Sequence, residues 1–452
     1  MFAPRSRLFN RGDRRVALRK DTAADGAMLP ASAFWRSFGP GLLWAAAAIG
    51  VSHLVQSTRA GAEAGFALWG VVLLALILKY PFFEYGPRYA AATGESLVEG
   101  YRRVGRWALW LYFLITVATA LIIQLAIVLF TAFLFQFVFG LSVSLPVVAA
   151  LVVASCGALL IAGRFRALDR TVKGVLVLLA VSTLIAAVAS VPRVDARTFA
   201  PWPLPSAPVI AFPFLLALVG WMPSAIDISV WSSLWTLAKD RDTGTRASVR
   251  HALLDFRIGY VGTGVLAFAF MTLGAGVMHG AGTSFDDRGT VFAIQLVDLY
   301  GETLGTWTRP LVLVAVVTTM FSTALTVIDG FPRAIARSLH VLRHAAPPGP
   351  GGAAGESTAY WASGAVLGVL TVVVIAGFAG TLTAMVDFAT IVSFLTAPLL
   401  GYINLRAVTA DHVPMEYRPG RRLLAFSWLG LILLGGTAVV YGVQVARGWI
   451  GN

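Results

Sequence analysis

The sequence has little charge and almost no cysteine, and both shortages narrow what the protein can be. Asp, Glu, Lys and Arg make up 13% of the 452 residues, which is about half their share in a soluble chain. The single cysteine, Cys156, excludes disulfides within the chain, a thiolate metal cluster and a Cys–Cys redox pair. A Gly-x-x-x-x-Gly-Lys-Ser/Thr nucleotide-binding motif is also missing, so this chain alone is not expected to use ATP.

Apolar side chains take the place of the missing charge. They make up 58% of the chain, and the mean hydropathy is +0.78. Stretches of about 20 apolar residues recur throughout, and each can cross a hydrocarbon core of about 30 Å as a helix. The sequence therefore predicts an all-α integral membrane protein with about 11 transmembrane helices. The predicted spans are residues 39–63, 65–88, 107–139, 146–163, 171–191, 208–236, 255–279, 307–339, 360–378, 381–406 and 423–446.

Three segments are predicted to lie outside the membrane. They are residues 1–35, a loop at residues 279–306, and a Pro/Gly-rich flexible connection at residues 347–355. The first is basic and is not followed by a short apolar region with a cleavage site, so we expect a retained cytoplasmic tail. Residues 36–452 are expected to form one transmembrane domain.

The basic residues alternate between the two sides of the predicted membrane. Of the 35 Lys and Arg residues, 28 lie in the N-terminal tail and in every second connection, and 5 lie in the connections between these. This asymmetry indicates which loops are cytoplasmic. We therefore expect a multi-pass protein of a bacterial-type inner membrane, with a cytoplasmic N-terminus and a C-terminus outside. The net charge of +13 then serves orientation and lipid contact, and no nucleic-acid partner is expected.

Two predicted spans contain residues that interrupt a helix. In the first span Gly50 and Ser52 are weak helix formers, and in the sixth Pro223 removes a backbone donor and clashes with the preceding turn. The breaks fall five spans apart, and paired interrupted helices are typical of a transporter site at mid-membrane. Structural kinks are the alternative, because Pro and Gly are common in membrane helices. The predicted substrate-binding residues are Gly50, Val51, Ser52, His53, Met222, Pro223, Ser224 and Asp227.

Ionisable side chains within membrane spans are costly and are candidates for function. Asp227 lies four residues after Pro223. It could pair with a cationic substrate or carry a coupling proton, or it could form a buried salt bridge or polar packing contact. His53 titrates near neutral pH, and could serve the substrate or a proton, or be a hydrogen-bonded structural imidazole. Lys79 could pair with a carboxylate in the core, with Asp227 as one choice.

Further ion-pair or coupling candidates lie nearer the ends of the spans. Arg59 could neutralise a substrate carboxylate or pair with Glu63 at the outer rim, and Asp387 could line the outer vestibule. Glu84 and Asp329 lie toward the cytoplasmic ends of their spans. For both, snorkelling or an ion pair with the arginine four residues later is the structural alternative.

One run carries a resemblance to a known family. Residues 65–97, Gly-Phe-Ala-Leu-Trp…Tyr-Gly-Pro-Arg-Tyr-Ala-Ala-Ala-Thr-Gly-Glu-Ser-Leu, resemble the second-helix region of the Nramp family of proton-coupled divalent-metal transporters. The opening Gly39-Pro-Gly-Leu-Leu43 and the Met222-Pro223 pair are similar to that family too. The resemblance covers nearly the whole chain after the tail and implies a LeuT-type fold with two inverted five-helix repeats plus one helix. The repeats would be about residues 39–191 and 208–406, and the extra helix about residues 423–446.

The family's metal-binding motifs are largely replaced here. Its first-helix Asp-Pro-Gly-Asn, whose Asp and Asn bind the metal, becomes the run Gly50-Val-Ser-His53. Its sixth-helix Met-Pro-His becomes Met222-Pro-Ser224, which leaves Met222 as a soft ligand. The family's acidic residue in the third helix, linked to proton exit, has no counterpart at residues 107–139.

The leading interpretation is a secondary-active transporter of Nramp-like architecture, without a cofactor. It would move a small cationic or zwitterionic solute across the lipid bilayer by alternating access, coupled to protons or another ion. One alternative is a divalent-metal transporter in which Met222, Asp227 and backbone carbonyls form an unusual metal shell. Another is a membrane sensor or enzyme on a transporter scaffold. The sequence has no paired-carboxylate, His-cluster or Ser/His constellation, so no enzyme is expected.

Overall fold

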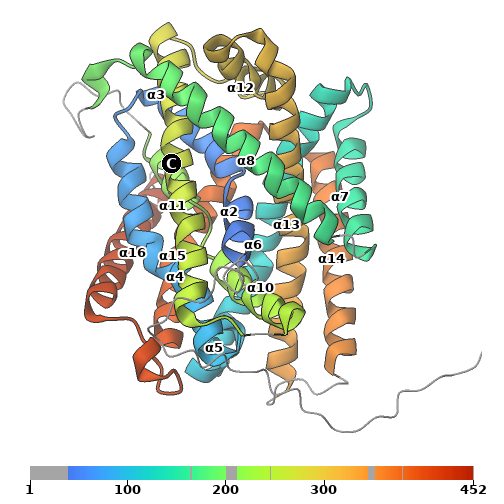
Figure 1. The fold of residues 1–452 in the computed structure, drawn as a ribbon, viewed down its shortest axis with the longest axis vertical. Coiled ribbons are helices and arrows are strands. Elements are labelled where there is room, and N and C mark those ends of the chain that lie inside the picture. The colour runs from blue at the N-terminus through green and yellow to red at the C-terminus, as the bar shows by residue number, and fades with distance from the viewer. Residues whose placement is uncertain are drawn as a thin grey trace, which may run out of the picture.

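The computed structural model describes residues 39–162, 165–199, 211–244, 246–344, 352–378 and 380–450. The predicted tail at residues 1–35 lies outside these ranges, as does most of the connection at residues 347–355. The described chain is helical, as predicted. It forms a bundle of helices, in which the helix labelled α2 (Pro40–Ala48) lies near the middle of the view in Figure 1.

The first span is divided into two helical pieces. α2 (Pro40–Ala48) ends before Gly50, and the chain resumes as a π-helical turn (Ser52–Ser57) that continues into α3 (Thr58–Ala64). Gly50 lies directly against Thr323: a Cβ added to this glycine would be 2.8 Å from the threonine side chain. The absence of a side chain at the break therefore lets the eighth span approach it.

The sixth span is divided in the same way. α9 (Phe212–Gly220) and α10 (Ile228–Thr243) are separated by the non-helical residues 221–227. Pro223 lies inside this break, where its missing N–H and its ring prevent the helix from continuing. Both breaks predicted from the sequence are therefore present.

The remaining spans are continuous helices. Among the described residues, seven helices are long and apolar enough to cross a membrane, and Leu145–Ile161 and Val177–Arg193 are shorter apolar stretches. With the two broken spans they correspond to the predicted order. Their bounds are α4 (Trp69–Thr93), α6 (Arg106–Phe139), α7 (Leu145–Ile161), α8 (Phe165–Ser190), α11 (Val249–Leu273), α13 (Arg309–Arg343), α14 (Gly352–Gly377), α15 (Leu382–Thr409) and α16 (Arg421–Ile450).

Two helices lie in segments predicted to be connections. α5 (Leu97–Val104) begins with a capping box, in which the side chains of Ser96 and Glu99 satisfy each other's backbone N–H groups. α12 (Gly289–Leu304) occupies most of the loop predicted at residues 279–306, so the prediction of a plain loop was wrong. A helix forms there because apolar residues recur every three or four positions. The buried face of α12 includes Phe292, Leu296, Leu299 and Tyr300.

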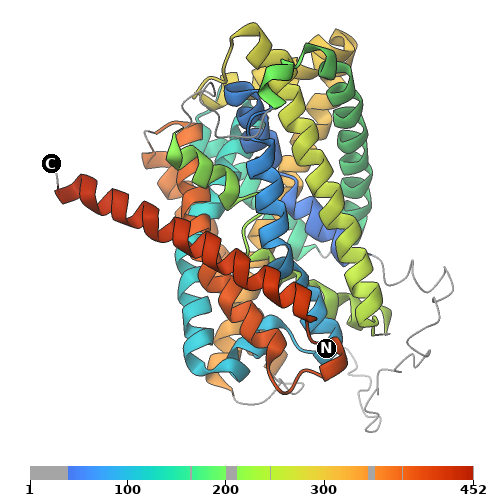
Figure 2. The same cartoon turned by 90° about the vertical axis from the view of Figure 1, so that its left-hand side faces the viewer.

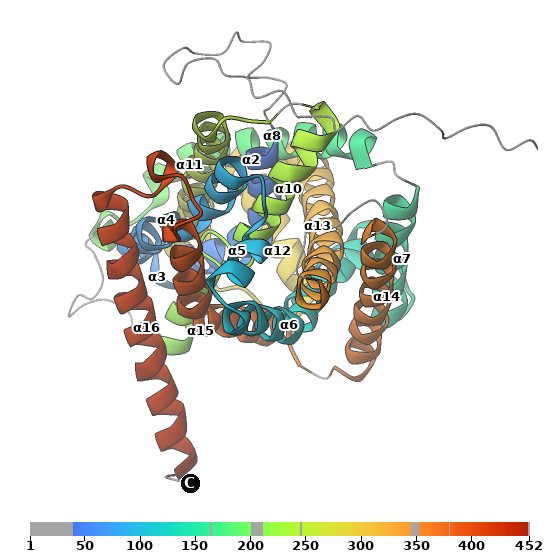
Figure 3. The same ribbon diagram turned by 90° about the horizontal axis from the view of Figure 1, so that it is seen from below.

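The two short helices mark the two ends of the bundle. α12 lies at one end together with α3, and α5 lies at the other (Figure 1). We call these the α12 end and the α5 end; the charge pattern predicts that the first is outside and the second cytoplasmic. α16 packs on α15 and α4 and then leaves the bundle obliquely at the C-terminus (Figures 2 and 3).

Close backbone contacts fix the broken spans to unbroken neighbours. α4 packs against α9 and α10, and α11 packs against α2 and α3. At Gly86 of α4, an added Cβ would be 2.1 Å from the Ser229 carbonyl oxygen of α10, and at Gly61 of α3 it would be 2.0 Å from the Met271 carbonyl oxygen of α11. Small residues permit this approach, as they do in other membrane helix pairs.

Candidate functional site

A small cavity lies between the two helix breaks. The space open to the centres of water molecules is about 40 Å³. A single water needs about 10–15 Å³ of such space. The cavity can therefore hold a few waters or a small solute. Its lining residues are Ala47, Ala48, Val51 and Ser52 of the first span; Trp221, Ser224, Ala225, Asp227, Ile228 and Trp231 of the sixth; Ile123 and Ile127 of α6; and Thr323, Val327 and Phe331 of α13.

The eight predicted binding residues divide into two sets. Half of them line the cavity, namely Val51, Ser52, Ser224 and Asp227. The other half are buried but are not among the lining residues, namely Gly50, His53, Met222 and Pro223. The sequence pattern therefore located the breaks, and the packing decides which of their side chains reach the space between them.

Asp227 is a buried carboxylate without a partner. Its side chain lines the cavity directly before the start of α10, and the residue is 2% exposed. Neither carboxylate oxygen accepts a hydrogen bond from another described residue. Buried polar atoms almost always have a partner, and a buried charge without one is strongly unfavourable. Asp227 therefore requires a proton or a cation that the described chain does not supply.

Lys79 binds backbone carbonyls and not a carboxylate. Its ammonium donates to the carbonyl oxygens of Val219 at 3.0 Å, Gly220 at 2.8 Å and Ser224 at 2.8 Å. The pairing with Asp227 considered from the sequence is not formed, because both oxygens of that carboxylate are without a partner. Lys79 instead holds the end of α9 and the following break, where helix carbonyls run short of intrahelical donors and the Met222 N–H also donates to the Val219 carbonyl oxygen, at 3.2 Å.

His53 is held by hydrogen bonds on both ring nitrogens. Nε2 is 2.9 Å from the Thr263 carbonyl oxygen in α11, and Nδ1 is 2.7 Å from the Ser52 hydroxyl. Since a carbonyl only accepts, Nε2 carries the hydrogen and donates it. The Ser52 hydroxyl also lies 2.6 Å from the Ala48 carbonyl oxygen, across the first break. His53 thus connects the break to α11 rather than facing the cavity.

An ion-pair network joins three elements at the α12 end. Arg59 donates to Asp387 of α15 at 2.8 Å and lies 3.3 Å from Glu63. Its guanidinium carbon is 4.8 Å from the ring centroid of Phe214 in α9. Gln56 donates to the same Asp387 oxygen at 2.9 Å. The predicted contact of Arg59 with Glu63 is present, and Asp387 is a second partner that the sequence did not reveal.

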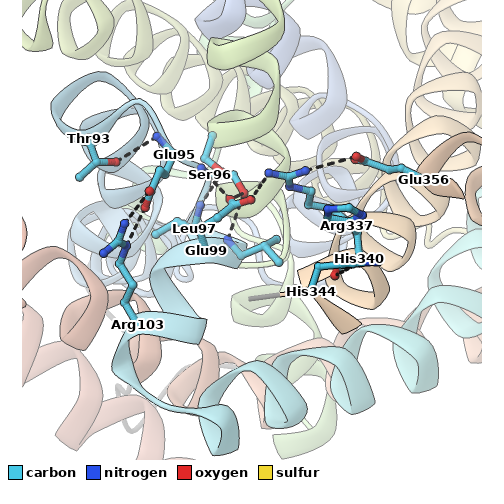
Figure 4. Close-up of polar contacts among 12 residues, drawn as sticks. Thr93, Glu95, Ser96, Leu97, Glu99, Arg103, Arg337, His340, His344 and Glu356 are labelled. Atoms are coloured by element: carbon cyan, nitrogen blue, oxygen red, sulfur yellow. Dashed lines mark hydrogen bonds and ion pairs between the residues drawn. The ribbon is translucent and has the colours of Figure 1, made fainter. Parts of the chain in front are cut away.

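A second network lies at the α5 end (Figure 4). Arg337 of α13 forms ion pairs with Glu99 of α5 and, at 3.2 Å, with Glu356 of α14. In the same view Arg103 pairs with Glu95, which stays within the α5 region. Sequence analysis did not select Arg337 or Glu99 as site residues. The capping-box spacing from Ser96 is the signal that places Glu99 at a helix start.

The two carboxylates predicted near the cytoplasmic ends form the expected local ion pairs. Glu84 pairs with Arg88, and it also accepts a hydrogen bond from Tyr80. Asp329 pairs with Arg333, and Tyr360 of α14 donates to it at 2.7 Å. Both arginines lie four residues after their carboxylates, which is the spacing at which helix neighbours meet.

Asn404 is a buried polar residue that sequence analysis missed. Its amide nitrogen donates to the Phe82 carbonyl oxygen at 3.1 Å and to the Ser229 hydroxyl at 2.9 Å, and its carbonyl oxygen accepts from Tyr101. It therefore joins α15 to α4, α10 and α5. A lone amide in an apolar span was the available signal, because polar groups in membrane helices seek partners on neighbouring helices.

The candidate metal ligands do not form a cluster in the described ranges. No group of three or more His, Cys, Asp or Glu residues there is arranged to hold a metal ion. Met222 is 0% exposed and is not among the cavity-lining residues, whereas Asp227 lines the cavity. Thus Asp227 is the one member of the predicted metal pair whose side chain borders this space.

Comparison with known proteins identifies the family. Residues 41–444 match the family model described as Nramp, natural resistance-associated macrophage protein-like. An uncharacterized protein of Pasteurella multocida (strain Pm70) is 33% identical over 418 residues, covering 92% of this chain and 93% of that protein.

The fold resembles those of solved transporters. A manganese transporter of Eremococcus coleocola has a TM-score of 0.70 at 16% identity, with 94% of this chain and 90% of that one covered. MhsT, solved in complex with L-phenylalanine, has a TM-score of 0.59 at 13% identity, covering 89% and 97%. Mhp1, a nucleobase-cation-symport-1 family transporter, has a TM-score of 0.53 at 16% identity, covering 92% of each chain. The predicted LeuT-type fold is confirmed, and the chain belongs to the Nramp family of multi-pass membrane transporters.

Proposed function

We propose that this protein is a secondary-active transporter that carries a small cation through the cavity between the two helix breaks. The observation that carries the proposal is the unpaired, buried carboxylate of Asp227 in that cavity. A cation that binds there supplies the missing partner. When no cation is bound, a proton on the carboxylate removes the unfavourable buried charge. Cation and proton therefore compete for one group, which makes proton exchange the simplest coupling.

The charges around the cavity favour a cation over a zwitterion. A zwitterion also needs a positive group for its carboxylate, and the two basic side chains nearest the breaks are already engaged. Lys79 binds three carbonyls, and Arg59 binds Asp387. The cavity wall instead includes the aromatic side chains of Trp221, Trp231 and Phe331. Aromatic faces attract cations, and together with Asp227 they suit an ammonium-type or guanidinium-type solute.

Networks at both ends of the cavity support alternating access. The Arg59–Asp387 pair connects the first span to α15 at the α12 end, and the Glu99–Arg337–Glu356 network connects α5, α13 and α14 at the α5 end. Transport requires that each end opens in turn while the other stays closed. We assign the two inverted repeats to about residues 39–191 and 208–406, with the α12 end outside the cell and the protein in the inner membrane.

A divalent metal ion is the second candidate substrate. The fold likeness to a manganese transporter supports it, as does the free carboxylate of Asp227, since carboxylate oxygens bind hard cations. Against it, the Met222 thioether does not line the cavity, and the Val219, Gly220 and Ser224 carbonyls are bound to Lys79. These three carbonyl oxygens are therefore not free to replace the water of a bare ion.

The test is proton movement in proteoliposomes that contain a trapped pH-sensitive dye. Guanidinium, which cannot cross as a neutral base, and Mn²⁺ are added outside in separate experiments. We expect guanidinium to drive proton release, more weakly at lower pH because protons compete for Asp227. Asp227→Asn should abolish the response, whereas Asp298→Asn, which alters a carboxylate paired with Arg309 at the α12 end, should retain it.

Three results would change the proposal. Proton movement of wild-type size in Asp227→Asn would remove Asp227 from the mechanism. A saturable response to Mn²⁺ that requires Asp227, without one to guanidinium, would establish the metal alternative. Equal responses in protein-free vesicles would show that the dye reports leakage and that no exchange occurs.

A further inference from the structure

The break in the sixth span forms a cradle of carbonyl oxygens, and the chain fills it with its own cation. The cradle consists of the Val219, Gly220 and Ser224 carbonyl oxygens, which lie 3.0, 2.8 and 2.8 Å from the Lys79 ammonium. Val219 and Gly220 are the last residues of α9, and Ser224 lies within the break. One side chain from α4 thus binds both the helix end and the loop that follows it.

The break is what makes these oxygens available. The last carbonyls of a helix lack donors from a following helical turn, and they carry the negative end of the helix dipole. Val219 is partly satisfied within the break, because its carbonyl oxygen also accepts the Met222 N–H at 3.2 Å. Carbonyls freed in this way at broken membrane helices bind Na⁺ or protons in transporters. Here an ammonium with three N–H donors meets three carbonyl oxygens, so each donor of Lys79 has an acceptor.

The ammonium has no carboxylate to balance it. Lys79 is 1% exposed, and among the described residues no acidic side chain forms a salt bridge with it, while Asp227 near the same break is itself unpaired. The Phe83 ring, with its centroid 5.7 Å from Nζ, is the other stabilising contact. Carbonyl dipoles and an aromatic face therefore hold the charge. Backbone carbonyl oxygens likewise hold K⁺ in the selectivity filter of a channel.

We propose that the carbonyl cradle is a monovalent-cation site in which the Lys79 ammonium is the permanent occupant. This extends the proposed function, because it explains which ligands the substrate can use. The cradle oxygens are unavailable to a transported ion, and Asp227 is left as the charged ligand of the cavity. Solutes that bring their own N–H donors are then favoured over bare ions that need many oxygen ligands.

The test removes the Lys79 ammonium by mutation and then adds a small ammonium ion that can bind in its place. Lys79→Ala removes the side chain beyond Cβ, and n-propylammonium supplies the same three carbons and the nitrogen. Thermal unfolding of the purified full chain is measured in detergent with n-propylammonium chloride, n-propanol or sodium chloride added at purification. Propanol matches the shape without the charge. Lys79→Met keeps the stem and leaves no space for the amine.

We expect Lys79→Ala to unfold at a lower temperature than the wild type. Propylammonium should raise its Tm saturably by about 2–5 °C, and propanol should have less than a third of this effect. Wild type and Lys79→Met should not respond. An equal rise in the Tm of Lys79→Ala with propanol would show that filling the space, and not the positive charge, stabilises the protein. A Tm for Lys79→Met at or above the wild-type value would show that the cradle needs no cation. Either result overturns the proposal.

A double variant separates this site from the transport site. Lys79→Ala/Asp227→Asn should be rescued by propylammonium as well as the single variant is, because the amine binds the carbonyl cradle. Loss of rescue in the double variant would mean that the amine binds Asp227, which overturns the cradle proposal and leaves the proposed function standing.

Rescue that persists while Asp227→Asn alone exchanges protons normally would overturn the proposed function and retain the cradle. If Lys79→Ala yields no folded protein with any of the three additives, the cradle is not a separable cation site and the proposal fails.

Discussion

Arg59 of the first span and Asp387 of the tenth form an ion pair in which a guanidinium nitrogen lies 2.8 Å from a carboxylate oxygen. The pair connects residues 328 positions apart in the sequence. At the opposite end of the bundle, Arg337 connects α13 to α5 and α14. Both ends of the cavity region therefore have a charge network that spans helices, which is the arrangement expected of a closed conformation.

Loss of the Arg59 charge should open the α12 end. In a Cys156→Ala background, Ser224→Cys places a reporter thiol on the cavity wall. A partly buried ion pair contributes about 1 kcal/mol, so Arg59→Gln should raise the rate of labelling by an impermeant thiol reagent added outside about five-fold. The rate is measured on intact cells. An unchanged rate would show that the pair does not control access from this side.

Loss of the Arg337 charge should open the α5 end instead. Arg337→Gln leaves Glu99 and Glu356 without their shared partner, so the same Ser224→Cys reporter should label faster from the cytoplasmic side of inside-out vesicles. Arg103→Gln is the matched control, because Arg103 pairs with Glu95 without joining α13 (Figure 4). Equal acceleration by both variants would indicate a general loosening of α5.

Removal of the His53 ring should weaken the fold more than it weakens binding. His53→Ala leaves the Thr263 carbonyl and the Ser52 hydroxyl without their imidazole partner, so the free energy of unfolding should fall by about 1–3 kcal/mol. His344→Ala, at the C-terminal end of α13, should change it by less than about 0.5 kcal/mol. Denaturant unfolding measures both. Lost transport with unchanged stability would instead favour a direct role for His53 in the pathway.

The two ends of α16 should lie on opposite sides of the membrane. In the Cys156→Ala background, Gly451→Cys should react with an impermeant thiol reagent on intact spheroplasts, because eleven spans place the C-terminus outside. Gly420→Cys, before the start of α16, should react only after permeabilisation. A reversed pattern would invert the predicted topology, and labelling of both without permeabilisation would show that α16 does not cross the membrane.

Features that depend on neighbouring residues in the sequence could be predicted. Features that depend on contacts between residues far apart in the sequence could not. The break at Pro223 follows from a missing donor and a steric clash. The Glu84–Arg88 and Asp329–Arg333 pairs follow from helical spacing. The partners of Lys79 could not be predicted, because its carbonyl acceptors lie 140 to 145 residues away. Which side chains border the cavity depended in the same way on packing against α6 and α13.

The α12 helix shows a different reason for a missed element. The sequence predicts a loop outside the membrane at residues 279–306, whereas the structure has the 16-residue helix α12 there. An amphipathic helix that lies on the end of the bundle needs only one apolar face, which here includes Phe292 and Leu296. A search for long apolar runs does not detect such a helix, whereas its three-to-four-residue periodicity does.

The close contacts of Gly86 and Gly61 have a mechanical consequence. α4 contacts α10 at Gly86, and its Lys79 binds the end of α9. It therefore contacts both halves of the sixth span. α11 contacts the first span in the same way. It packs against α3 at Gly61, and its Thr263 carbonyl oxygen accepts a hydrogen bond from His53. Both breaks are therefore held by unbroken neighbours, and these four spans form one packed block. Opening the cavity without breaking these contacts would require the block to slide against α6 and α13, which supply the other residues of the cavity wall.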